Sequence, residues 1–115
     1  MPSQNVDNTV VTYTGLVANQ NYTYNLTRTP STNSAHGASI QAVYSGSSPT
    51  FVIALAASND GINFAPISGT SVSVSAAGTT VWDLGTPNYK FVQVQETYTS
   101  GTINLTLIFN ANNLS

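Results

Sequence analysis

Charged side chains are the scarcest feature of this 115-residue sequence. Asp, Glu, Lys and Arg make up 5% of the residues, against about 25% in an average globular protein. The only basic residues are Arg28 and Lys90, and the formal net charge is −2. Because nucleic-acid binding relies on several Lys or Arg side chains at phosphates, this composition excludes a nucleic-acid-binding protein.

Cysteine and long apolar runs are both absent. The lack of cysteine excludes disulfide scaffolds, Cys-ligated zinc and thiol catalysis. A membrane-spanning helix needs roughly 20 mostly apolar residues, and no run in the sequence approaches that length. Residues 1–5 are polar and do not open a signal peptide. We therefore expect a protein made in the cytoplasm, with no signal peptide and no membrane partner.

Acid–base and metal-binding groups are also few. His36 is the only histidine and has no acidic residue within eight positions, so neither a catalytic triad nor a histidine metal site forms from its local sequence. Asp60 and Asp83 are candidates for the carboxylate pair of a glycosidase, but the sequence Asn59-Asp60-Gly61 explains Asp60 as a turn residue. One carboxylate is too little for a calcium site. We predict no catalytic, cofactor or metal residues, and a protein that is not an enzyme.

Residues that favour β-strands are abundant in this sequence. Val, Ile, Thr, Tyr and Phe are common, and the usual residues of helix surfaces are rare. In residues 103–109, apolar side chains alternate with Asn104 and Thr106, which is typical of a strand buried on one face. The same reasoning predicts strands at 9–14, 22–27, 38–45, 50–57, 63–67, 70–75, 79–84, 89–98 and 102–109, with one of the first two open to being an arm outside the sheet.

Turn signals separate these segments at intervals typical of a β-sandwich, at residues 46–49, 59–61, 76–78, 85–87 and 100–102. We therefore expect an all-β fold, a single antiparallel β-sandwich of about eight strands, with jelly-roll or immunoglobulin-like topology. The alternation predicts these core residues: Phe51, Ile53, Leu55, Val72, Val74, Val92, Val94, Leu105 and Leu107.

The segment before residue 38 differs from the rest. Residues 18–37 are mostly polar, and they cannot build a core alone. We therefore divide the chain into an extended polar N-terminal region, 1–37, that contacts a partner, and a β-sandwich domain, 38–115. Tyrosine is enriched at interfaces because it adds contact area at a small entropic cost.

The expected interface residues are Tyr13, Tyr22, Tyr24 and Leu26. The alternative is that Tyr22 and Tyr24 simply cover the sandwich of their own chain. Trp82 is either a sugar-stacking platform or a core anchor, and the large area that an indole buries favours the core.

Several short motifs together resemble a family of small β-sandwich proteins from the structural gene clusters of tailed phages. These are SNDGINF at 58–64, VSV at 72–74, GTTVWD at 78–83, YKFVQV at 89–94 and SGTINLT at 100–106. The likeness spans residues 50–107, and the polar segment before residue 38 departs from it. The resemblance implies a virion component, either a capsid decoration protein or a tail-associated module, with no catalytic residues to carry over.

Two functions follow as hypotheses. The first is a non-enzymatic virion structural protein, a capsid decoration (cement) protein on the particle surface, made in the host cytoplasm. Its partners would be the major capsid protein or other virion proteins, and copies of itself, with a trimer expected. A surface with so few charges is weakly protected against association, which suits an assembled state. The alternative is a carbohydrate-binding β-sandwich module, in which exposed aromatic side chains stack on a glycan.

Overall fold

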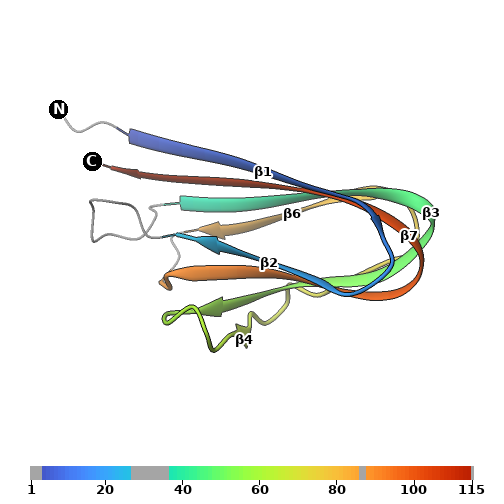
Figure 1. Cartoon of the computed structure of the whole chain (residues 1–115). Coiled ribbons are helices and arrows are strands. Elements are labelled where there is room, and N and C mark those ends of the chain that lie inside the picture. Colours follow the sequence, from blue (N-terminus) through green and yellow to red (C-terminus); the bar gives the residue numbers. More distant parts are fainter. Residues whose placement is uncertain (1–3, 27–36, 86–87, 115) are drawn as a thin grey trace.

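The computed structural model describes residues 4–26, 37–85 and 88–114, and the side chains of residues 8–26, 37–85 and 88–111 (Figure 1). Within these ranges all regular structure is β-strand, joined in one antiparallel hydrogen-bonded network. The seven strands are β1 (Gln4–Leu16), β2 (Gln20–Asn25), β3 (Gly37–Ser58), β4 (Ala65–Pro66), β5 (Val72–Val74), β6 (Gly78–Gly85) and β7 (Phe91–Leu114). Nothing in the described residues forms a helix with the length and hydropathy that crossing a membrane requires.

Two long strands organise the network. β3 and β7 pair with each other from Gly37↔Asn112 to Ser58↔Phe91. β1 and β6 flank the half that contains the beginning of β3 and the end of β7. The shorter strands β2, β4 and β5 flank the other half. Each half is thus a small sheet, and β3 and β7 run through both.

The two halves fold onto each other because β3 and β7 bend together midway along their length, at the right of Figure 1. The rings of Tyr44 and Phe51 lie 5.7 Å apart, although seven residues of straight strand would separate them by roughly 23 Å. At the bend Gly46 and Gly101 both have positive φ. A Cβ on Gly46 would overlap the Thr102 carbonyl oxygen, so only glycine permits this close crossing of the two backbones.

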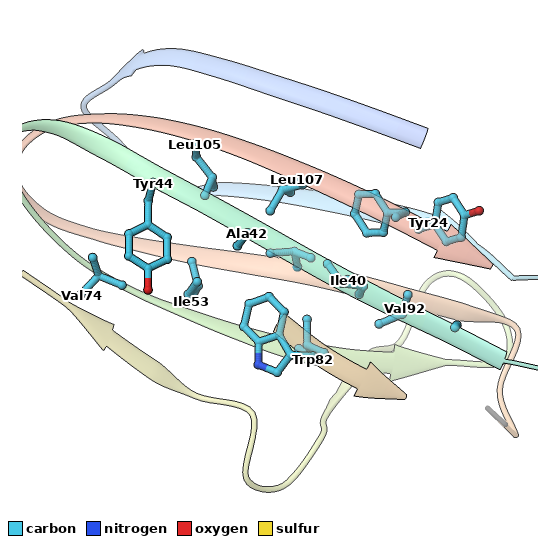
Figure 2. Packing of buried hydrophobic residues seen from close by; sticks show 14 of the residues in the cluster. Tyr24, Ile40, Ala42, Tyr44, Ile53, Val74, Trp82, Val92, Leu105 and Leu107 are labelled. Carbon is cyan, nitrogen blue, oxygen red and sulfur yellow. The ribbon is translucent and has the colours of Figure 1, made fainter. Parts of the chain in front are cut away.

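The facing sides of the two layers form the hydrophobic core (Figure 2). Alternate residues of β3 and β7 point inward, as the period of two predicts. The predicted core is confirmed, with one difference: Val72 is only partly buried and packs at its margin. The other eight predicted side chains are Phe51, Ile53, Leu55, Val74, Val92, Val94, Leu105 and Leu107, all exposed by 5% or less.

The antiparallel β-sandwich expected from the sequence is therefore confirmed, but its strands are longer than expected. The segments 38–45 and 50–57 are two parts of β3, and 89–98 and 102–109 lie largely within β7. Their turn signals mark bends, because both strands bend at the same place and remain paired across it. The turn expected at 85–87 falls partly outside the described residues.

The N-terminal region is not separate from the sandwich where the structure describes it. β1 pairs with the second half of β7, and β2 pairs with the first half. Residues 4–26 therefore supply one strand to each layer, and residue 37 does not mark a boundary of the core. Residues 27–36, which include Arg28 and His36, lie outside the described part of the chain.

Candidate assembly surface

Two of the four expected interface residues lie in the core of their own chain. Leu26 is fully buried and Tyr24 is 6% exposed. The backbone N–H of Leu26 also donates to the Lys90 carbonyl oxygen at 2.7 Å, which closes the end of β2 against the start of β7. This burial leaves Tyr24 and Leu26 no surface for a partner, which corrects that expectation. Tyr13 and Tyr22 pack against the core and keep part of their surface exposed.

Trp82 is a core anchor, as the sequence favoured. Its indole is 8% exposed, and its Nε1–H donates to the Thr70 carbonyl oxygen at 2.9 Å. The Thr70 hydroxyl in turn donates to the Ile67 carbonyl oxygen and accepts from the backbone N–H of Leu55. Trp82 therefore fastens the loop before β5 to β6, while the Thr70 hydroxyl fastens it to β3, and the indole offers no open ring face for a sugar.

Asp60 is the centre of the turn between β3 and β4. One carboxylate oxygen accepts from the backbone N–H groups of Ile62 and Asn63 and from the Ser58 hydroxyl, and the other accepts from the Asn63 side-chain amide. The backbone hydrogen bonds from Asn63 and Ile62, followed by the side-chain bonds, hold the pKa of Asp60 well below its usual range. These four donors occupy the carboxylate, so Asp60 serves the turn expected from Asn59-Asp60-Gly61.

The second candidate carboxylate is likewise part of a turn. Asp83 Oδ1 accepts from the backbone N–H of Gly85 at 2.9 Å, at the end of β6. No group of three or more His, Cys, Asp or Glu side chains suited to a metal ion occurs within the described residues. Near Asp83 lies a shallow depression of about 340 Å³, lined by Gly37, Ala38, Ser39, Val81, Asp83 and Asn110.

Glu96 is a buried acid that the sequence analysis overlooked. It is 2% exposed on the inner face of β7, opposite Gln20 of β2 and Ile53 of β3. Neither carboxylate oxygen has a hydrogen-bond partner of ordinary geometry in the described residues. Burial therefore raises the pKa of Glu96, and the backbone N–H of Gln20 offsets this rise only in part. The alternation of Val92, Val94 and Glu96 in the sequence is the signal that places it inward.

The most distinctive surface is the outer side of the layer formed by β1, β7, β3 and β6. We call it the outer valine face and define it by Val10, Val43, Val81 and Ile108. Val10 and Val81 are 59% and 62% exposed, and Val43 is 38% exposed. The strand register aligns Val10, Ile108, Gln41 and Val81 in one row across all four strands. The face therefore presents apolar side chains with few charges among them.

One edge of this face is formed by β1, and the other by β6. β1 runs in unbroken register with β7 from Gln4↔Leu114 to Tyr13↔Leu105, and no strand of the described residues pairs with its other side. Its sequence contains neither Lys, Arg nor Pro, and Asp7 is its one charged residue. Charged side chains, above all Lys, and Pro normally protect edge strands from pairing with other chains. β1 is therefore an unprotected edge from Gln4 to Tyr13, before the irregularity between Tyr13 and Leu16.

Fold and surface together define an antiparallel β-sandwich whose polar clusters belong to turns and whose outer valine face is open. No family model and no curated protein sequence matches the chain. Among solved structures, it is similar to the SPBc2 prophage-derived protein YomS, with a TM-score of 0.60, 14% identity and coverage of 92% of this chain and 95% of that one. It is also similar to a structure described as Bacillus endospore appendages that form a family of disulfide-linked pili, with a TM-score of 0.57, 9% identity and coverage of 97% and 88%.

Proposed function

We propose that this chain is a non-enzymatic structural protein of a phage particle, and that it binds the capsid lattice as a decoration protein. The observation that carries the proposal is the outer valine face, with Val10, Val43 and Val81 exposed on the same side of one layer. Exposed apolar side chains gathered on one face are typical of protein–protein contact sites. The major capsid protein, or another virion protein, is the partner that this face would contact.

The structural neighbours support an assembled, structural role at the level of fold. One is prophage-derived, and the other is described as forming pili. The pili of the second neighbour are disulfide-linked, and this chain has no cysteine. This sequence therefore supplies no disulfide to an assembly, and the contacts that we propose are apolar side chains and backbone hydrogen bonds.

The carbohydrate-binding alternative has less support. A sugar-stacking platform needs an aromatic ring exposed on the surface. The six tyrosines, four phenylalanines and the tryptophan all lie in the described part of the chain, and each is buried or only partly exposed there. The apolar side chains that are well exposed are aliphatic, namely Val10, Val17, Val43, Ile62 and Val81.

The test is a particle-binding assay with particles that lack the protein. Purified protein should bind them at copy numbers that follow the capsid lattice, and a particle map should show one density at each equivalent lattice position. Val43→Lys should abolish binding, because Val43 lies within the outer valine face. Ile62→Lys is the matched control, since Ile62 is 81% exposed in the turn after β3, away from that face. Failure to bind particles, combined with binding to a soluble glycan, would reverse the choice between the two functions.

A further inference from the structure

We propose that two copies of this chain pair through their β1 strands, antiparallel and about a two-fold axis at Val10, so that the outer sheets of both copies become one sheet. This self-association concerns the edge of the outer layer, whereas the proposed capsid contact concerns its face. It does not rest on the proposed function, and it is tested on the isolated protein.

The edge strand itself provides the first argument. β1 is thirteen residues long, while the other flanking strands β2, β6, β5 and β4 have six, eight, three and two residues. It carries the longest row of backbone N–H and C=O groups at any edge of the described network, and neither Lys, Arg nor Pro protects it. An added strand satisfies such groups without charged side chains, and a second copy carries the same edge.

The charge and side chains of β1 select the register. A two-fold axis through Val10 pairs residues 7–13 of the two copies, which all lie before the irregularity between Tyr13 and Leu16. The same register places Asp7 opposite Tyr13 of the second copy. An axis through Asp7 would place the two Asp7 residues opposite each other, and like charges directly opposite in a sheet are destabilising. Charge therefore excludes the axis through Asp7 and permits the axis through Val10.

The side-chain pattern agrees with this register. Directly opposite residues of antiparallel strands point to the same face of the sheet. The outward-pointing Val10 would meet Val10 of the second copy and join the rows that contain Ile108 and Val81 in both copies. On the inner side, Val11 and Tyr13 pack against the core and remain partly exposed beside the edge, where the second copy would cover them. Each copy uses its β1 edge in this pairing, so no further copy can add there. The assembly is then a dimer and not the trimer expected from the sequence.

Cross-linking tests the register directly, because the native chain has no cysteine and each variant carries one thiol. Cβ atoms directly opposite in an antiparallel pair lie about 4.5–5.5 Å apart, close to the span of a disulfide. With copper phenanthroline as oxidant, Val10→Cys should form a disulfide-linked dimer. Val17→Cys and Val81→Cys are the matched controls, because both valines are 62% exposed but lie beyond β1 and on β6. Equal cross-linking of all three variants would overturn the register.

Sedimentation equilibrium tests the dimer without cross-linking. The unmodified protein should be dimeric, and Val10→Lys should weaken the dimer at least roughly tenfold by placing two ammonium groups opposite each other. Val17→Lys should leave the dissociation constant unchanged. Because Val10 is 59% exposed, Val10→Lys should keep the circular dichroism spectrum of the unmodified protein, and the two Tm values should agree at concentrations below the dimer dissociation constant.

Three results would overturn the proposal: a monomer at about 100 µM, a trimer, or a dimer that Val81→Lys dissociates and Val10→Lys does not. A dimer that binds no particles would overturn only the proposed capsid contact. A monomer that binds particles would overturn only the β1 pairing.

Discussion

The ring of Tyr24 stacks on the ring of Phe109, with 4.7 Å between the centroids and 10° between the planes. Tyr24 belongs to β2 and lies opposite Val92 at the start of β7, whereas Phe109 lies beyond the bend of β7, in the other layer. Tyr22 contacts the same phenylalanine at 5.2 Å. These aromatic contacts hold the short edge strand β2 against the opposite layer.

Replacing Tyr24 with alanine should therefore destabilise the isolated chain. Removing a buried aromatic side chain costs about 3–5 kcal/mol, and Tyr24→Ala should lower the free energy of unfolding in urea by that amount. Asn21→Ala, an exposed change in the same strand, should stay within about 0.5 kcal/mol. A Tyr24→Ala variant of unchanged stability but altered association would return Tyr24 to the interface role expected from the sequence.

The bend in β3 and β7 leads to a second prediction, which concerns the replacement of Gly101 by alanine. At Gly101 a Cβ would overlap the Ser48 carbonyl oxygen, and the Tyr98 hydroxyl donates to the Gly101 carbonyl oxygen at 2.7 Å. Gly69 also has positive φ, but a Cβ there would meet no atom within 4 Å. Gly69→Ala should thus cost about 1–2 kcal/mol from backbone strain alone. Gly101→Ala should cost clearly more or prevent folding, as measured by urea denaturation and soluble yield, and equal costs would contradict the close crossing.

The hydrogen bonds of Asp60 lead us to expect that the folded protein loses stability in acid. The hydrogen bonds from Asn63, Ile62 and Ser58 lower its folded-state pKa, so their contribution is present above its ordinary value of 3.8 and is lost as the pH falls below it. Asp60→Asn removes this titration. The difference in Tm between the native chain and Asp60→Asn should therefore shrink from pH 6 to pH 2, as recorded by thermal melts. For Thr79→Asn, an exposed change without a titrating group, the difference from the native chain should stay constant.

The burial of Glu96 leads us to expect the opposite pH dependence of stability, a loss as the pH rises. Burial raises its folded-state pKa, so the folded protein holds a proton that the unfolded chain has lost, and stability falls as the pH rises above the ordinary value of 4.5. Glu96→Gln should match the native chain near pH 4 and exceed its Tm at pH 7 and above. Glu96→Leu should add about 1–3 kcal/mol at pH 7, because it removes an unsatisfied buried polar group. Parallel Tm profiles for the native chain and Glu96→Gln would contradict this.

The sequence predicted the features that depend on nearby residues. The alternation in residues 103–109 identified an inward face, and Asn59-Asp60-Gly61 identified a turn, because both signals are contained in a few consecutive positions. The burial of Trp82 followed from its size. The strand boundaries were less accurate, since Gly46 and Gly101 permit a bend as readily as a chain reversal and local sequence does not distinguish the two.

The assignments that depended on distant residues were the ones that changed. Tyr24 and Leu26 lie in a polar stretch, and they become core residues only because β2 pairs with the beginning of β7. The outer valine face arises in the same way, since Val10, Val43 and Val81 belong to three strands that come together through β7 and β3. Periodicity shows which side of a strand is apolar, but it contains no information about which strands become neighbours.

The pairing of Gln4 with Leu114 has a consequence for biosynthesis. A ribosome makes β1 and β2 first, and the strand with which both of them pair, β7, is made last (Figure 1). Until β7 has been translated, β1 and β2 have no strand to pair with, and β3 lacks the partner that runs along its whole length. During translation, β3 can therefore pair with β4, β5 and β6, but β1 and β2 must wait for β7 before they join the sandwich.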